Sequence, residues 1–420
     1  MSFCGLDFGT SNSTLGARQG DRLALVPIEG AATTLPSAIF FDFQASRALI
    51  GREAIDAYIR GVDGRFMRSL KSVLGTDLID QDTLLDKHRI GFRDVLARLV
   101  GAVKLRAETA LGHALDAVVH GRPVHFVDGD ADADRRAEAA LDDIARAAGF
   151  RQVSFQYEPI AAARDYEQQV EREEIALIAD IGGGTSDFSI VRLGPDRRSR
   201  ADRASDILAN DGIRIGGTDF DRLLSLKAVM PHLGYQSPMK RPGLLAPNGY
   251  FTDLSTWSKI NFLYTPQIRA ELIQVRREAA QPELFDRLIT LIDHQHGHRL
   301  AMTIERAKIK LSETSALKLK LDWIEPGLAA AISRQRFDRA TGDLAARIGA
   351  MVQRCLADAG LSAGAIDAVF LTGGSTLLGN VRRAILAEVP AARIVEGDKF
   401  GSVGIGLTLE AALRYGPGPI

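Results

Sequence analysis

The protein has 420 residues, a length that suits two lobes or domains better than one simple core. Its hydrophobic and charged fractions, 46% and 25%, are ordinary for a soluble globular protein. A net charge of −1 points to no nucleic acid and no anionic membrane as a partner, and no apolar run approaches the ~20 residues that a membrane helix needs.

Two cysteines, Cys4 and Cys355, are far too few for a disulfide framework, which fits a reducing compartment. The chain enters its first predicted strand at Phe3 without the basic region that opens a signal peptide. We therefore expect a cytoplasmic protein.

The N-terminal segment is predicted to form three strands, at residues 3–8, 13–17 and 22–28. Asp7 lies near the end of the first strand, and the turn after it combines glycine with side chains that can donate hydrogen bonds. That turn comprises Gly9, Thr10, Ser11 and Asn12. A glycine turn beside an Asp can hold a phosphate, but such turns are also common in hairpins that bind nothing.

Lys71 stands between apolar residues and is followed by a turn at Gly75. It can reach inward to a phosphate, or it can bury its stem and leave its ammonium in water. The local sequence alone favours the second interpretation.

Residues 117–127 predict a strand with a kink at Pro123. The acidic run after it, from Asp128 to Asp134, imitates the start of a calcium loop but lacks the later Gly and Glu that such a loop needs. We interpret it as the cap and acidic first turn of a helix over residues 134–148.

Glu158 precedes Pro159, a residue that suits the first turn of a helix. The local sequence leaves open whether Glu158 is a functional carboxylate or a residue of the helix cap.

The clearest signal is a second glycine turn between two apolar runs, and it predicts a strand, a tight turn and a second strand. Asp180 closes the first run and Asp187 opens the second, and the turn between them contains Gly182, Gly183, Gly184 and Thr185. The N–H groups of such a turn can approach an anion closely, and two carboxylates suit a hydrated Mg²⁺. We read this turn and the N-terminal one as two halves of one phosphate clamp.

Two further glycine pairs are candidates for nucleotide binding. Gly216 and Gly217 precede a predicted helix, although turns of this kind are more often structural. Gly373, Gly374 and Ser375 follow a predicted strand at 368–371 and lead into another helix.

A stretch from about residue 231 to 264 breaks the pattern with four prolines and several glycines. Its aromatic residues indicate either a partner-binding patch or packing under a long loop. Beyond it, residues 299–314 predict a helix that carries Glu305, Lys308 and Ser312 on one face, facing a nucleoside or water.

Taken together and in this order, these motifs resemble the nucleotide-binding half of the seventy-kilodalton heat-shock chaperones, within the superfamily of actin and sugar kinases. The resemblance covers nearly the whole chain, and its closest counterpart is the truncated bacterial heat-shock-like branch. The segments that carry it are residues 5–12, 71–75, 158–163, 180–187, 216–221, 305–312 and 372–376.

The resemblance implies an α/β fold of the actin-like ATPase (ribonuclease-H-like) class, with two lobes around a central nucleotide cleft. We expect residues 1–174 and 399–420 to form the first lobe and residues 175–398 to form the second, with a loop-rich insertion near 231–264. It also implies a chain without the family's peptide-binding domain, which cannot hold unfolded peptide in the family's way.

The resemblance also assigns roles to individual residues. It implies that Lys71 and Glu158 face the active site, which reverses the local interpretation of Lys71. It also implies that Asp7, Glu158, Asp180 and Asp187 surround Mg²⁺, mostly through water. It implies that Thr10, Ser11, Asn12, Thr185 and the glycines hold the phosphates of ATP or ADP. The resemblance implies that the nucleoside is bound by Glu305, Lys308, Ser312, Gly373, Gly374 and Ser375.

Some positions depart from the family pattern. The family commonly stacks an Arg on adenine after the Lys that matches Lys308, and here that position is Ile309. The Arg and Pro expected after residue 376 are Leu377 and Leu378, and an acidic residue expected near 400 is replaced by the sequence Lys399-Phe400. We therefore expect adenine selectivity to be less secure than phosphate binding.

The sequence thus predicts a slow, Mg²⁺-dependent ATPase in which Lys71 orients the attacking water, Asp180 takes up its proton, and Glu158 and Thr185 complete the catalytic set. The alternatives are a nucleotide-binding scaffold without useful hydrolysis and an actin-like filament protein. A protein partner is expected at the 231–264 insertion.

Overall fold

The computed structural model describes residues 2–86, 88–198, 200, 203–398 and 401–416. The chain divides into two compact units. Unit 1 contains Met1–Gly217, Ala346–Leu377 and Val381–Ile420, and unit 2 contains Thr218–Ala345 and Leu378–Asn380. The boundaries between these units differ from the boundaries predicted for the two lobes. The division into two lobes stays a prediction. Lys399 and Phe400, where an acidic residue was expected, lie outside the described residues.

Unit 1 contains two sheets with the same plan. In the first, the antiparallel pair β1–β2 is extended by β10 and β11, which run parallel to β1, and by β3 beside β2. In the second, the antiparallel pair β12–β13 is extended by the parallel strands β17 and β18 and by β14 beside β13. The predicted likeness of the two glycine hairpins therefore extends to the sheets around them.

The strands of the first sheet are β1 (Phe3–Phe8), β2 (Asn12–Gln19), β3 (Arg22–Leu25), β4 (Thr34–Pro36), β10 (Ala117–Arg122) and β11 (Gln152–Tyr157). Those of the second are β12 (Glu174–Ile181), β13 (Ser186–Leu193), β14 (Ile207–Ile213), β17 (Ala368–Thr372) and β18 (Arg393–Glu396). The central strands β12 and β17 are nearly continuous apolar runs because they are buried on both faces.

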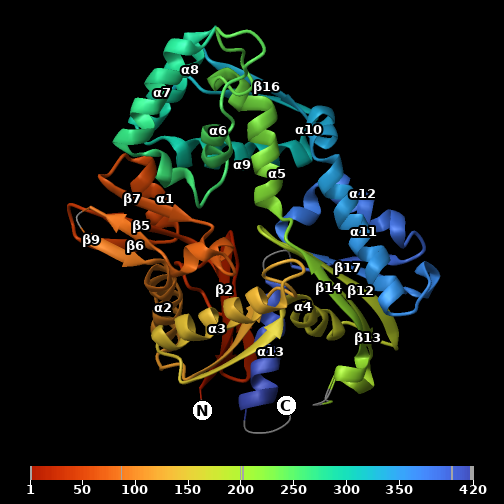
Figure 1. Cartoon of the computed structure of the whole chain (residues 1–420). Coiled ribbons are helices and arrows are strands. Elements are labelled where there is room, and N and C mark those ends of the chain that lie inside the picture. The colour runs from red at the N-terminus through yellow and green to blue at the C-terminus, as the bar shows by residue number, and fades with distance from the viewer. Residues whose placement is uncertain (1, 87, 199, 201–202, 399–400, 417–420) are drawn as a thin grey trace. The chain divides into compact units, whose positions relative to one another are not determined.

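Two helices join the sheets into one core. Helix α4 (Glu158–Glu167) packs on the second sheet, α13 (Ser402–Tyr415) packs on the first, and the two helices pack against each other (Figure 1). One apolar cluster contains residues from both helices and both sheets. The helices come this close because Gly406 has no side chain, since a Cβ there would overlap the backbone of Ala161.

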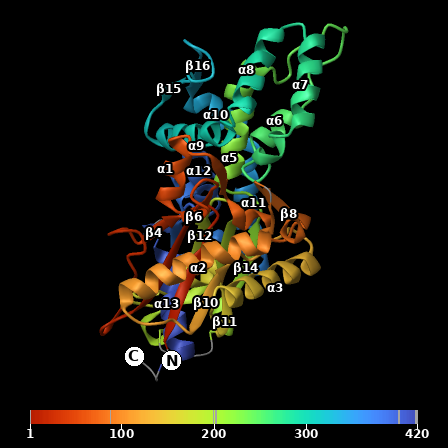
Figure 2. The same cartoon turned by 90° about the vertical axis from the view of Figure 1, so that its left-hand side faces the viewer.

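The other face of the first sheet is covered by α2 (Phe92–Leu111) and α3 (Ala131–Ala147), which run side by side (Figure 2). Helix α2 faces the sheet with a stripe at helical spacing that includes Val95, Leu99 and Val103, all fully buried. The helix predicted at 134–148 is confirmed, with α3 starting three residues earlier after an Asp130 cap that accepts from Ala133 N–H.

Smaller elements complete unit 1. They are β5 (Ala38–Asp42), β6 (Arg47–Ile50), α1 (Arg52–Ile59), β7 (Gly64–Arg68), the 3₁₀ turns η1 (Leu70–Val73) and η2 (Asp77–Asp80), β8 (Asp82–Leu85), β9 (His88–Gly91), η3 (Pro195–Arg197), η4 (Ala204–Asp206), η8 (Ala363–Ala365) and η9 (Gly374–Leu377). Strand β5 pairs with both β6 and β7, and β8 pairs with β9.

Unit 2 is mostly helical, with one two-stranded sheet. Its elements are η5 (Ser225–Val229), η6 (Met230–Leu233), α6 (Gly249–Leu254), η7 (Ile260–Leu263), α7 (Pro266–Glu278), α8 (Pro282–Asp293), α9 (Gly297–Glu313), β15 (Ala316–Lys320), β16 (Ala329–Ser333) and α10 (Arg334–Ala340). Three helices cross the bounds between the units, namely α5 (Gly217–Leu224), α11 (Gly342–Asp358) and α12 (Gly379–Glu388). Helices α7 and α8 form a hairpin, visible in green in Figure 2.

The stretch 231–264, predicted to be rich in loops, contains η7, α6 and most of η6. These short helices form because their apolar residues are buried, among them Phe251 and Ile260, and Trp257 between α6 and η7 is buried as well. Leu244, Leu245 and Phe262 remain exposed. Its role as a partner surface stays a prediction.

Two local predictions are wrong. The strand predicted over 117–127 ends at Arg122, because Pro123 has no N–H to give to a ladder and side chains take over the backbone groups that follow. The helix predicted directly after Gly373 begins only at Gly379, since a 3₁₀ turn, η9, comes first.

None of the helices in the described ranges combines the length and apolar character of a membrane span.

Candidate functional site

The turns of the two predicted hairpins lie against each other inside unit 1. A Cβ placed on Gly183 would lie 2.5 Å from Oγ of Ser11, and one on Gly184 would lie 2.9 Å from Oγ1 of Thr10. The hydroxyl side chains of the β1–β2 turn therefore occupy the space that the glycines of the β12–β13 turn leave open. The two turns are therefore brought together, and their binding of phosphate stays a prediction.

The other glycine pairs join the same place. A Cβ on Gly216 would lie 2.5 Å from the carbonyl carbon of Gly183, and Gly217 N–H donates to the Gly182 carbonyl over 3.0 Å. The Ser375 hydroxyl donates to the same carbonyl over 2.9 Å. Gly373 has a left-handed φ of +80° and lies against the backbone of Ile181. Four segments that are distant in sequence thus meet at the end of β12.

The predicted charged residues also gather here. Lys71 Nζ and Glu158 Oε1 form a buried ion pair at 2.5 Å. Asp180 and Asp187 are directly opposite each other in the β12–β13 ladder, an arrangement that like charges disfavour. Asp7 is half-buried at the end of β1.

The pKa values show that these groups act on one another. Burial, then the charge of Glu158, raises the pKa of Asp7 and that of Asp187 to about 7 each. Burial and the charges of Glu158, Asp187 and Asp7 raise the pKa of Asp180 well above its ordinary value. Burial alone would lower the pKa of Lys71, but the charges of Glu158 and Asp7 outweigh it and raise that pKa. Four carboxylates thus share one ammonium.

Lys71 reaches this place through an unusual backbone turn. Ser69 adopts a left-handed φ of 59°, a strained conformation for a residue with a side chain, and the 3₁₀ turn η1 starts directly after it. The chain therefore turns so that Lys71 points inward and is buried together with Glu158. The sequence offered no sign of this turn, and the inward placement of Lys71 was predicted only from the resemblance.

Asp187 has two hydrogen-bond partners. The Thr185 side chain bonds to it, and Val124 N–H donates to its Oδ1 over 2.7 Å. Gly212 leaves room for this arrangement, because a Cβ there would lie 2.8 Å from the same carboxylate oxygen. Sequence reasoning missed Val124, which acts through its backbone and carries no chemical signature; the only sign was the Arg122-Pro123 pair beside it.

The residues predicted to hold the nucleoside belong to different units. Gly373, Gly374 and Ser375 lie with the glycine turns of unit 1, whereas α9, which carries the other three, belongs to unit 2. On α9, Lys308 Nζ bonds to Asp221 Oδ2 over 3.0 Å in a buried ion pair, and the Ser312 hydroxyl donates to the Ile309 carbonyl over 2.6 Å. Glu305 is half-buried on the same helix. These assignments stay predictions.

In the part of the chain that the structure describes, no group of three or more His, Cys, Asp or Glu side chains is arranged to hold a metal ion. The predicted role of the four carboxylates was mainly to hold the waters around Mg²⁺, which usually keeps several of them. That role stays a prediction.

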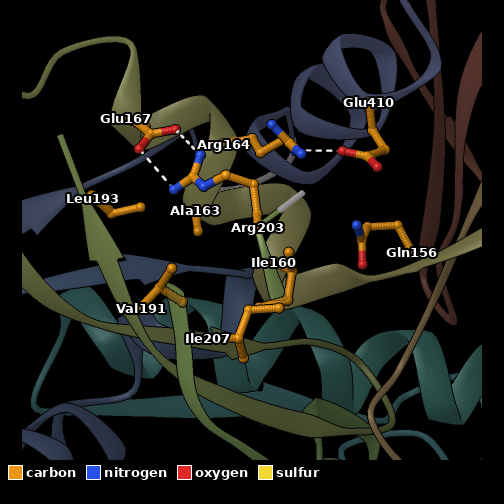
Figure 3. Close-up of a pocket in the computed structure, with 10 residues that line it drawn as sticks. All are labelled: Gln156, Ile160, Ala163, Arg164, Glu167, Val191, Leu193, Arg203, Ile207 and Glu410. Atoms are coloured by element: carbon orange, nitrogen blue, oxygen red, sulfur yellow. Dashed lines mark hydrogen bonds and ion pairs between the residues drawn. The ribbon is translucent and has the colours of Figure 1, made fainter. Parts of the chain in front are cut away.

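Unit 1 also contains a cavity of about 240 Å³ beside α4 (Figure 3). Its wall is apolar at Ile160, Val191 and Ile207, and its charged side chains are paired with one another. Arg203 pairs with Glu167 and Arg164 with Glu410. None of the predicted site residues lines this cavity.

The family model for the Hsp70 protein matches residues 3–230 and 288–416. The chain belongs to the Hsp70 family. Its fold is accordingly the actin-like ATPase fold, as predicted, and the family is one of nucleotide-binding, chaperone-type ATPases.

Residues 231–287 lie outside the Hsp70 match and comprise the end of unit 2 that holds α6, α7 and the start of α8. This unmatched stretch begins where the predicted insertion begins, and it continues beyond residue 264. All the site residues that unit 1 brings together, from Asp7 to Ser375, fall inside the matched ranges.

Proposed function

We propose that this Hsp70-family protein binds ATP with Mg²⁺ and hydrolyses it slowly. The observation that carries the proposal is the buried Lys71–Glu158 pair, set among three further carboxylates beside glycine turns that pack on one another. Phosphoryl transfer needs mainly positioning and charge compensation, and these are the residue types that supply them.

Phosphate binding is assigned to the turn of Gly9, Thr10, Ser11 and Asn12 and to the turn of Gly182 to Thr185. Both offer backbone N–H groups without bulky side chains, and hydroxyls that can donate to phosphate oxygens. Gly216 and Gly217 add a further turn at the start of α5. The nucleoside is assigned to Glu305, Lys308 and Ser312 together with Gly373, Gly374 and Ser375.

The charge of the site fits a divalent cation. Lys71 is the positive group that acts on Asp7, Asp180 and Asp187 and pairs with Glu158, and burial raises the pKa of each of the three aspartates. These four carboxylates would hold the waters of Mg²⁺, and the ion would neutralise charge on the phosphates. This assignment rests on the surplus of negative charge.

Lys71 and Asp180 are assigned the chemical step. The Lys71 ammonium, held by Glu158, orients the attacking water by a hydrogen bond and offsets negative charge near the γ-phosphate. Asp180 accepts the proton that this water releases as its oxygen bonds to phosphorus, and its raised pKa makes it a better proton acceptor than an ordinary aspartate. The products are ADP and inorganic phosphate.

Single-turnover hydrolysis of ATP with Mg²⁺ and excess protein tests the proposal. We expect slow conversion to ADP in the wild type and a rate at least about 100-fold lower in Lys71→Ala, with nucleotide binding largely kept. Lys318→Ala removes an exposed lysine and should behave as wild type. Because Lys71→Ala leaves Glu158 unpaired, Lys71→Met and a thermal melt check that the loss does not come from unfolding. Turnover near the wild-type rate in both variants would refute the role of Lys71.

A nucleotide-binding scaffold without useful hydrolysis is the second candidate. It is favoured by Ile309 and Leu377, which stand where the family places adenosine contacts and whose side chains are 52% and 42% exposed. Wild-type protein that binds ATP and leaves it intact in the same assay would select this function.

A further inference from the structure

The segment between β10 and α3 supplies the site with a hydrogen bond. Val124 N–H donates to Asp187 Oδ1 across 63 positions of sequence, and both residues are buried. Residues 123–130 form neither helix nor strand, so no ladder of hydrogen bonds fixes their path. Side chains must therefore hold Val124 in place.

Arg122 holds the backbone of this segment directly. Its Nε donates to the Pro123 carbonyl over 3.0 Å, and its Nη2 donates to the Val124 carbonyl over 3.2 Å. The residue whose N–H binds Asp187 is thus itself held through its carbonyl. A guanidinium suits this task because its donors stand in a rigid planar fork.

Arg122 is in turn fixed on all sides. It forms ion pairs with Glu138 and with Asp134 of α3, the latter at 3.3 Å. Its guanidinium lies 5.1 Å from the ring centres of both Phe126 and Tyr157, and its side chain is only 11% exposed. Tyr157 directly precedes Glu158, so the same guanidinium also packs against the residue before the partner of Lys71.

Asp134 holds the segment from the other side. Its Oδ1 accepts hydrogen bonds from the N–H groups of Phe126 and Val127. This carboxylate was predicted to serve only the first turn of a helix, but it ties the loop to that helix. Arg122 and Asp134 together clamp the backbone on both sides of Val124.

We propose that Arg122 is a positioning residue of the nucleotide site, which holds Val124 so that its N–H keeps the Asp187 carboxylate in its working orientation. The expected effect of Arg122 on turnover rests on the proposed function. Its effect on the orientation of the Asp187 carboxylate does not, because it requires no bound nucleotide. A small displacement of Asp187 would leave nucleotide contacts in place and disturb the charges around the reacting phosphate.

The kinetic test compares three variants under steady-state conditions with Mg²⁺-ATP. We expect Arg122→Leu to lower kcat by up to about 100-fold with little change in KM, since none of the residues assigned to ATP contacts is altered. Arg122→Lys keeps the charge but loses the fork, so its kcat should lie between the two. Arg135→Leu removes a 73% exposed arginine of α3, the helix that carries Asp134, and should match the wild type. An Arg122→Leu protein with the kcat of the wild type overturns the proposal.

A second measurement does not depend on ATP hydrolysis. Amide hydrogen exchange of Val124 should be at least about tenfold faster in Arg122→Leu, the change that losing one hydrogen bond to a charged group causes, and unchanged in Arg135→Leu. Val119, within β10, serves as the internal reference and should keep its wild-type rate. Equal acceleration at Val124 and Val119 would mean general destabilisation and would refute the role. If the wild type does not hydrolyse ATP, the proposed function fails, and Val124 exchange still decides whether Arg122 positions this segment.

Discussion

The two glycine hairpins of unit 1 have the same strand order around them and nearly the same sequence pattern, yet their turns differ in one respect. The β1–β2 turn contributes side chains, the hydroxyls of Thr10 and Ser11. The β12–β13 turn has no side chains at Gly183 and Gly184, and the hydroxyls occupy the space that this leaves. The side chains of one turn thus fit against the glycines of the other, so the two turns are complementary in shape and are not two copies of one binding loop.

Gly216→Ala should break this complementarity most severely. The added Cβ would lie 2.5 Å and 2.6 Å from the carbonyl carbons of Gly183 and Gly184, and backbone atoms cannot rotate away. We expect a loss of about 3 kcal/mol in the free energy of unfolding, measured by urea denaturation. Gly182→Ala is the matched control, because its Cβ would lie in ordinary contact, 3.5 Å from the carbonyl oxygen of Thr185. Equal stability of the two variants would contradict the observed packing.

Asp187→Asn tests the charge at the second hairpin. Burial and the charge of Glu158 raise the pKa of Asp187 from 3.8 to about 7, so the folded protein holds this proton more tightly than the unfolded chain does. The resulting stability is complete below about pH 4 and is lost as the pH rises to about 7. Without Mg²⁺ and nucleotide, Asp187→Asn should therefore gain stability relative to the wild type between pH 5 and pH 8, by an amount of the order of a few kcal/mol.

The measurement is urea denaturation of both proteins at the two pH values. Burial and the charge of Glu158 raise the pKa of Asp7 in the same direction, so the variant should keep part of the decline. His120 acts in the opposite sense, since burial lowers its pKa to about 4 and its contribution is lost as the pH falls from 6.5. A difference between Asp187→Asn and the wild type that is the same at both pH values would show that Asp187 titrates normally.

The smallest expected effect comes from a substitution that tests how closely the two turns pack. Gly183→Ala brings a Cβ to within 2.5 Å of Ser11 Oγ, which a side-chain rotation can partly relieve, so we expect a loss of about 1 kcal/mol. Adding Ser11→Ala removes that oxygen and should restore most of the loss, giving a favourable coupling in a double-mutant cycle. Strictly additive effects would mean that the two turns do not meet as described.

The hairpins themselves were predictable because local patterns encode them. Apolar runs around glycine turns predicted β1–β2 and β12–β13, and helical spacing predicted α9 nearly to its ends. These elements depend on residues a few positions apart, which the sequence displays directly. The grouping of Asp7 with Asp180 was inferred from the repeated motif and from the family resemblance.

Other parts of the site were not predictable from local sequence. Lys71 looked like a solvated side chain, and only the left-handed turn at Ser69 and the buried carboxylate of Glu158 explain its position. Asp134 looked like a helix-dipole residue, and its bonds to Phe126 and Val127 depend on where β10 ends. A backbone donor such as Val124 has no residue type to recognise.

Local sequence patterns were enough to predict both glycine hairpins and several helices, and seven ordered motifs predicted the Hsp70 family, which the family match confirms. Three features became visible in the folded chain alone: Thr10 and Ser11 fit against Gly183 and Gly184, Lys71 is buried with Glu158, and Arg122 bonds to Val124, the partner of Asp187. The physical reason is that periodicity and turn chemistry act between neighbours in the chain. The charges and hydrogen bonds of the site act between segments that only the packing of the two sheets through α4 and α13 brings together.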